Sequence, residues 1–152
     1  MADFSLSRST RIQAPPERVH PLLDDFREWQ KWSPWERVDP DLRRDYSGPD
    51  HGVGSRYHWS GNKKAGEGEM TITGSTPASV VVDLAFLKPF KATNVTRFDL
   101  AAAGEATEVT WTMTGTRSAV MSVMGKLYFD KAIGKDFERG LASLKREAER
   151  PA

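Results

Sequence analysis

Apolar and polar residues alternate along the middle of the chain with the period of two that is typical of β-strands. In the clearest run Val109, Trp111 and Met113 alternate with threonines, as in a strand with one face in the core and one polar face. Seven segments with such patterning, bounded by turn residues, are predicted strands: 4–12, 42–46, 55–60, 67–75, 79–87, 93–101 and 108–116. The short connections between most of them predict an antiparallel sheet.

Two other segments have a helical period. After the first strand, prolines that are tolerated in a first turn precede a predicted helix of roughly 10–12 residues, which Pro21 shortens or bends. Near the C-terminus, apolar residues three or four positions apart predict one long helix over about 121–149, with this apolar face: Phe129, Ile133, Phe137, Leu141, Leu144 and Ala148. Gly125, Gly134 and Gly140 are unfavourable there by about 1 kcal/mol each, which indicates close backbone approach or a kink.

This element order predicts an α+β fold. A curved antiparallel sheet of about six to seven strands wraps around the long C-terminal helix, with one or two short helices after the first strand. The helix is the available cover for the apolar face of the sheet. A strongly curved sheet around one helix leaves a concave, mostly apolar space of the kind that binds ligands. The length of 152 residues predicts a single domain, residues 1–152.

Composition excludes several classes of function. The chain has no cysteine, which excludes disulfides, cysteine zinc sites, iron–sulfur clusters and cysteine nucleophiles. With 22 Lys and Arg against 21 Asp and Glu, the net charge of +1 gives little support to a nucleic-acid partner. No apolar run approaches the ~18 residues of a membrane span, and the N-terminus has no signal-peptide core. We therefore expect a cytoplasmic protein.

Several different short motifs follow one another over about 140 residues. They are 14–17 (APPE), 24–26 (DDF) followed by Trp29, Trp32 and 33–35 (SPW), 46–49 (YSGP), 52–54 (GVG), 57–62 (YHWSGN), 66–72 (GEGEMTI) and 134–141 (GKDFERGL). Together they resemble the SRPBCC or START-like superfamily, in its polyketide cyclase/dehydrase and lipid-transport branch. The resemblance implies a helix-grip fold with an internal hydrophobic cavity. Members include carriers, aromatase/cyclases, ligand sensors, ribosome-directed toxins and chaperone co-activators, so the fold alone does not identify the function.

Candidate ligand contacts come from the strand residues that share one parity and from the tryptophan-rich segment. They are Trp32, Trp35, Tyr57, Trp59, Met70, Ile72, Leu84, Phe86, Phe98, Trp111, Met113 and Phe129. These residues either line a cavity for a flat or elongated apolar ligand or fill a core. The assignment assumes unbroken alternation, because a β-bulge turns the residues beyond it to the other face.

Trp29, Trp32 and Trp35 fall within seven residues, between the first helix and the next strand. An indole packs through its ring while its N–H still reaches water or a carbonyl. The segment therefore forms either a lid at the cavity mouth or a second small core that pins the loop.

Polar candidates are few. The three histidines, His20, His51 and His58, lack the spacing of a metal site, and neither a metal nor another cofactor is expected. Because His58 alternates with two aromatic residues, we expect it to face outward, although a general base in the cavity is the rival interpretation. Glu67 is a further acid–base candidate, and Arg97 is a candidate to bind a ligand carboxylate.

Three hypotheses follow for the function. The chain binds a hydrophobic small molecule such as a lipid, a fatty acyl chain or a polyketide-like aromatic. Alternatively, it is a cyclase, dehydratase or hydrolase that acts in the same cavity. The third hypothesis is a toxin-like or co-chaperone-like interaction module, which requires an exposed apolar patch, with residues 29–35 as the candidate. The sequence leaves a monomer and a homodimer equally open.

Overall fold

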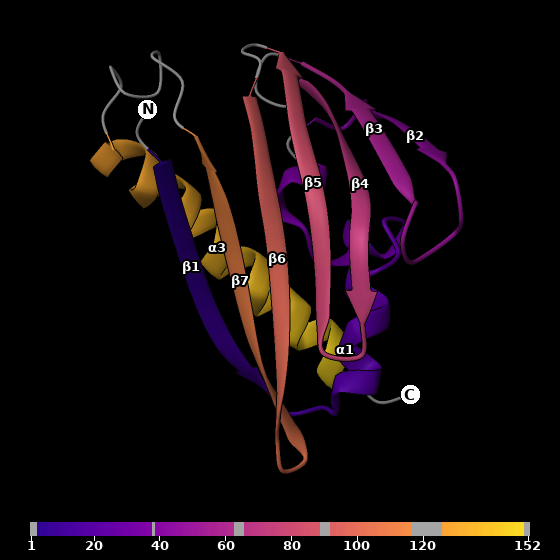
Figure 1. Cartoon of the computed structure of the whole chain (residues 1–152), viewed down its shortest axis with the longest axis vertical. Coiled ribbons are helices and arrows are strands. Elements are labelled where there is room, and N and C mark those ends of the chain that lie inside the picture. Colours follow the sequence, from indigo (N-terminus) through magenta and orange to yellow (C-terminus); the bar gives the residue numbers. More distant parts are fainter. Residues whose placement is uncertain (1–2, 38, 63–65, 89–91, 117–125, 151–152) are drawn as a thin grey trace.

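A computed structural model of the chain describes residues 3–37, 39–62, 66–88, 92–116 and 126–150. One seven-stranded antiparallel sheet has the order β1-β7-β6-β5-β4-β3-β2, and a long helix crosses one of its faces (Figure 1). The strands are β1 (Asp3–Ile12), β2 (Arg43–Ser47), β3 (Arg56–Ser60), β4 (Glu67–Thr76), β5 (Ser79–Lys88), β6 (Ala92–Ala103) and β7 (Ala106–Thr116). The helices are α1 (Pro16–Leu23), the 3-10 turns η1 (Glu28–Lys31) and η2 (Pro34–Arg37), and α3 (Lys126–Glu149).

The first strand completes the sheet by pairing with the last one, so that Leu6 lies opposite Met113. Helix α3 has 24 residues, or about 36 Å at 1.5 Å per residue, and packs against β1. In Figure 1 it runs diagonally behind β1, β7 and β6, while α1 sits at the opposite end of the grip from the N-terminus. The predicted α+β helix-grip architecture is therefore confirmed. No helix among the described residues is long and apolar enough to cross a membrane.

The predicted alternation is present on β7. Val109, Trp111 and Met113 are 0%, 1% and 3% exposed, whereas the threonines between them are partly exposed. The same parity holds in β4 and β5, where buried Met70 lies opposite Leu84 and buried Ile72 opposite Val82. The concave face of the sheet is thus built by period-two patterning, as the sequence predicts.

Two β-bulges interrupt this alternation. Leu87 is an extra residue in β5, and Thr73 is an extra residue in β4, where Ile72 pairs with Val82 but Gly74 pairs with Val81. Both bulges lie beyond the predicted inward residues, which keep their face. Past the second bulge, however, Ser75 pairs with the fully buried Val80. The bulge therefore turns Ser75 toward the concave side, where unbroken alternation would have placed it on the outer face.

The helical regions differ from the prediction in detail. Helix α1 has 8 residues instead of the predicted 10–12, because it ends with Asp24 as its C-cap. The tryptophan-rich segment that follows contains the 3-10 turns η1 and η2. The predicted start of the long helix at 121–125 lies outside the described residues. Two of its three glycines allow the expected close approach. A Cβ on Gly140 would lie 2.7 Å from Trp111 Cζ3, and one on Gly134 would clash with the Arg8 guanidinium.

Candidate functional site

One half of the concave face is filled by aromatic rings, which we call the aromatic cluster: Trp29, Trp32, Trp35, Phe98, Trp111 and Phe137. Its centre is the stack of Trp111 on Phe137, with centroids 4.1 Å apart and planes at 7°. Trp32 meets the rings of both Trp111 and Phe98 edge-on, at 5.6 and 5.8 Å. These edge-to-face and stacked geometries are the favourable ones for aromatic pairs. This half of the grip is a packed core.

Hydrogen bonds fix the tryptophan-rich segment to the helices. The indole nitrogens of Trp29 and Trp32 donate to the carbonyl oxygens of Leu23 and Leu22, at 2.9 and 2.8 Å. Both side chains are buried, and only Trp35 is half-buried, with its Nε1 donating to Asp136 Oδ2 of α3 at 3.3 Å. Trp29 and Trp32 therefore fit the interpretation of a small core that pins the loop. They offer no exposed apolar surface to a protein partner.

The other half of the concave face carries Trp59, Met70, Leu84, Phe86 and Asn94, which we call the Trp59 wall. Trp59 and Phe86 lie edge-to-face at 5.8 Å, and both remain partly exposed although they point to the same side as the buried core. Trp59 also stacks on Tyr57, at 6.1 Å. Large aromatic side chains on a concave face that stay partly accessible are typical of a ligand-binding wall.

Gly68 makes room for this wall. Trp59 lies opposite Gly68 in the sheet, and a Cβ there would lie 2.6 Å from Trp59 Cζ2 and 2.6 Å from the Ala85 carbonyl oxygen. Cβ atoms essentially never approach other atoms this closely. The missing side chain at Gly68 therefore lets the indole of Trp59 lie flat on β4.

Two polar side chains of β6 face the same space. Asn94 lies opposite Leu84, and Thr96 opposite both Val82 and Met113. They are 8% and 3% exposed. Among the described residues, the only buried side-chain nitrogen or oxygen atom without a hydrogen-bond partner is Trp111 Nε1, in the aromatic cluster. A few polar side chains on a mostly apolar face are typical of ligand sites, where they orient the polar part of a ligand.

Next to Trp59, the side chains of Tyr57, Glu36 and Arg44 form a buried hydrogen-bonded group, which we call the polar clamp. The Tyr57 hydroxyl donates to Glu36 Oε2 at 2.6 Å, and Arg44 Nε donates to Glu36 Oε1 at 2.9 Å. Arg44 Nη2 also donates to the Glu36 carbonyl oxygen, at 2.8 Å, so η2 is tied to β2 and β3. Burial, and then the hydrogen bond to Glu36, raise the pKa of Tyr57 well above its usual range. This phenol is held in its protonated form.

The polar residues proposed from the sequence lie away from the concave face. His58 and Glu67 are partners at 2.9 Å, and the second His58 nitrogen lies 3.8 Å from Asp45 Oδ2. Because Tyr57 and Trp59 face inward, His58 faces outward, as expected. Arg97 is exposed and pairs with Asp99 at 2.8 Å. The geometry brings His58 and Glu67 together, but on the outer face of the sheet.

Most of the other ligand-contact candidates from the sequence are buried. Tyr57, Met70, Ile72, Leu84, Phe98, Trp111 and Met113 are all buried on the concave side. The side chain of Phe129 lies outside the described residues. Sequence reasoning missed Glu36, whose burial depends on the folding of η2. Among the described residues, no group of three or more histidine, aspartate and glutamate side chains is arranged to hold a metal ion.

Two open hollows are bordered entirely by described residues. One, of about 510 Å³, lies on the outer face over β4 to β7, beside Glu69, Asp83 and Thr93. The other, of about 560 Å³, lies between α1 and the turn that joins β4 to β5. Glu69 and Asp83 therefore face outward, as predicted.

Comparisons with known proteins agree with this architecture. The family model described as "Polyketide cyclase / dehydrase and lipid transport" matches residues 3–149. A crystal structure of the di-domain ARO/CYC BexL from the BE-7585A biosynthetic pathway is 19% identical, with a TM-score of 0.74 over 99% of this chain and 51% of that chain. Protein CV1439 from Chromobacterium violaceum is 15% identical, with a TM-score of 0.70 over 97% and 98% of the two chains.

A protein from Arthrobacter aurescens, solved by NMR, is 18% identical, with a TM-score of 0.63 over 93% of this chain and 86% of that chain. At these identities the likeness concerns the fold. A comparison with curated proteins found no match.

Proposed function

Because the chain belongs to the polyketide cyclase/dehydrase and lipid transport family, we propose that it binds a hydrophobic small molecule between the sheet and α3, against the Trp59 wall. The ligand class is a lipid, a fatty acyl chain or a polyketide-like aromatic. The ring faces of Trp59 and Phe86 suit flat or elongated apolar molecules, which bury most of their surface in such sites.

The main support is a difference in exposure on one face. Trp59 and Phe86 stay partly exposed, while the inward-facing Phe98 and Trp111 are 0% and 1% exposed. This difference supports a ligand site beside Trp59 and Phe86 and not within the aromatic cluster. Asn94 supports a ligand with one polar end, because it lies opposite Leu84 on the same face of the sheet.

Binding is tested by titrating the protein with medium- and long-chain fatty acids and with flavonoid-like aromatics, using calorimetry. We expect at least one class to bind, and Trp59→Ala or Phe86→Ala to weaken that binding about fivefold, since aromatic contacts contribute about 1 kcal/mol each. Val95→Ala is the matched control, because Val95 is 40% exposed on the opposite face of the sheet. Binding that survives both wall substitutions contradicts the proposal.

A cyclase or dehydratase acting in the same space is the second candidate. Tyr57 favours it, because its hydroxyl stays protonated on the concave side and Glu36 holds it in a fixed position. Because its proton is donated to Glu36, the Tyr57 oxygen would position a folded substrate by accepting a hydrogen bond from it. The test uses an aromatic β-diketone thioester as the substrate. If the protein is an enzyme, the Tyr57→Phe variant loses turnover of this thioester but still binds it. A wild-type protein that binds this thioester and leaves it unchanged contradicts the enzyme alternative.

A further inference from the structure

A second group of reactive side chains lies outside the Trp59 wall, in the hollow between α1 and the β4–β5 turn. Ser75 and His20 both border this hollow, which has a volume of about 560 Å³. Its other lining residues are mostly apolar and include Pro21, Pro77 and Leu100. The hollow therefore combines an apolar surface with one hydroxyl and one imidazole.

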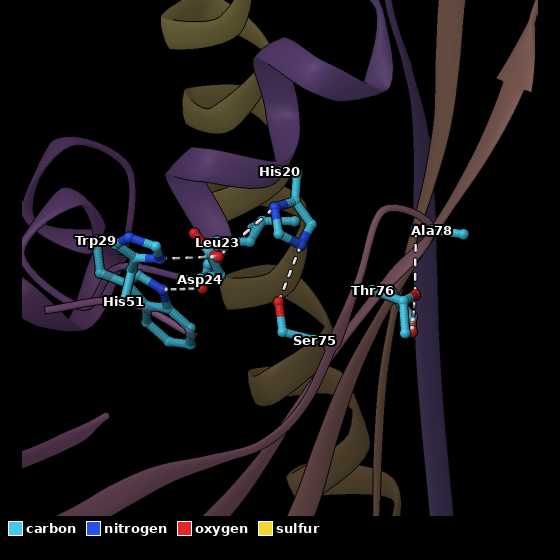
Figure 2. Close-up of polar contacts among 9 residues, drawn as sticks. His20, Leu23, Asp24, Trp29, His51, Ser75, Thr76 and Ala78 are labelled. Carbon is cyan, nitrogen blue, oxygen red and sulfur yellow. Dashed lines mark hydrogen bonds and ion pairs between the residues drawn. The ribbon is translucent and has the colours of Figure 1, made fainter. Parts of the chain in front are cut away.

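Ser75 and His20 form a chain of contacts with Asp24, which lies behind His20 (Figure 2). Ser75 Oγ lies 3.1 Å from His20 Nε2, within hydrogen-bond distance. His20 Nδ1 lies 3.6 Å from Asp24 Oδ2 on the far side of the ring. The Asp24 carboxylate is largely buried, and His51 approaches it at 3.8 Å from the other direction. With the proton on Nδ1, facing Asp24, Nε2 is free to accept the proton of Ser75.

Local structure fixes each member of this group. His20 and Asp24 are four residues apart on α1, so they lie on one side of the helix. Asp24 caps the end of α1, where its backbone N–H donates to the His20 carbonyl oxygen, and its own carbonyl accepts the Gly52 N–H at 2.9 Å. Ser75 reaches His20 only because the bulge at Thr73 turns it inward. Bulges re-aim side chains in this way beside active sites.

We propose that Ser75, His20 and Asp24 form a nucleophilic site that cleaves esters with a short apolar acyl chain bound in this hollow. His20 takes the Ser75 proton as Oγ attacks the ester carbonyl carbon. The bond from that carbon to the leaving alcohol breaks, and the alcohol oxygen receives the proton from His20. Water then attacks the acyl-serine, giving one proton to His20, which returns it to Ser75 as the acid leaves. Asp24 is a positioning residue that orients the imidazole.

The test uses two readouts on the full chain. An alkyl fluorophosphonate, which forms a bond to an activated serine and releases fluoride, is followed by peptide mass spectrometry. Hydrolysis of p-nitrophenyl butyrate is followed by nitrophenolate absorbance. Ser79 is the matched control, because it lies in the same hairpin but its hydroxyl contacts Thr76 at 3.0 Å instead of a histidine. We expect Ser75 to be labelled at least tenfold faster than Ser79, and Ser75→Ala to lose ester hydrolysis.

Variants of the other two residues separate chemistry from folding. His20→Ala is expected to lower both rates at least tenfold, and added imidazole to restore part of the loss, which a merely structural role would not allow. Asp24→Asn is expected to slow the reaction when His20 is present, but not the imidazole-rescued reaction of the His20→Ala protein, since free imidazole needs no orientation.

Equal labelling of Ser75 and Ser79 in the wild-type protein overturns the proposal, and so does a His20→Ala protein that reacts at the wild-type rate. The labelling and hydrolysis results do not depend on the proposed function. Ligand binding at the Trp59 wall is measured by calorimetry and does not involve Ser75.

Discussion

The two halves of the concave face contain the same kinds of residue but bury them to different extents. Around Trp111, six aromatic side chains pack ring to ring, and Phe98, Trp111 and Phe137 are at most 1% exposed. Around Trp59, two aromatic rings on the same face remain partly exposed. The difference comes from what covers them. The segment from Trp29 to Trp35 adds three indoles to the first half, whereas nothing comparable among the described residues covers the second.

Glycine acts differently in the two halves. In the aromatic cluster, Gly140 lets α3 settle onto the ring of Trp111, since a Cβ added there would lie only 2.7 Å from Cζ3 and 3.2 Å from Pro34. At the Trp59 wall, Gly68 lets an indole lie against the strand backbone. One glycine allows close packing between helix and sheet, while the other allows close packing of a side chain on the strand next to it.

The largest effect is expected from Trp111→Ala. This side chain is fully buried and stacked on Phe137, so its loss leaves a cavity and should lower the free energy of unfolding by about 3–5 kcal/mol. Trp59→Ala removes a partly exposed ring and should cost about 1–2 kcal/mol. Urea unfolding followed by circular dichroism measures both. Equal losses would mean that the two halves are packed alike.

The next effect concerns the clamp that borders the wall. Glu36→Ala leaves the Tyr57 hydroxyl and Arg44 Nε without their acceptor, and should cost about 1.5–3 kcal/mol. Glu28→Ala is the control, because its ion pair with Lys31 is at the surface and contributes at most about 1 kcal/mol. The comparison is read from the same unfolding curves. A Glu36→Ala protein as stable as Glu28→Ala would show that the clamp is not needed.

The two helix glycines should respond differently to the same substitution. Gly140→Ala forces a methyl group against Trp111 and Pro34, and overpacking of this kind costs about 1–3 kcal/mol. Thermal unfolding should show the loss clearly. If Gly140→Ala is instead neutral, the cluster is looser than its ring distances indicate.

The smallest effect is expected from Gly134→Ala. The added methyl group meets only the end of the Arg8 side chain, which has room to move because it is partly exposed. The gain in helix propensity, about 1 kcal/mol, should offset the weakened contact of Arg8 with Glu138. We expect a change in unfolding free energy close to zero, and a loss comparable to that of Gly140→Ala would contradict this account.

The sequence predicts the fold well, because alternation on β7 and the three-to-four spacing of Phe137, Leu141 and Leu144 each specify one face. It predicts the site less completely. Parity places Trp59 and Trp111 on the same face, but their different burial depends on where η1 and η2 fold over the sheet. Ser75 could not be assigned to His20, because Gly74 permits a bulge without specifying one, and the bulge at Thr73 reverses the expected direction.

The central claim is that free space for a ligand lies at Trp59 and not within the aromatic cluster. Protein labelled with 5-fluorotryptophan gives one fluorine resonance for each of its five tryptophans, and single Trp→Phe variants assign them. On titration with the tightest-binding fatty acid or aromatic, we predict that the Trp59 resonance shifts while those of Trp29 and Trp32 stay in place. A ligand that shifts Trp29 and Trp32 but leaves Trp59 unchanged would contradict the account.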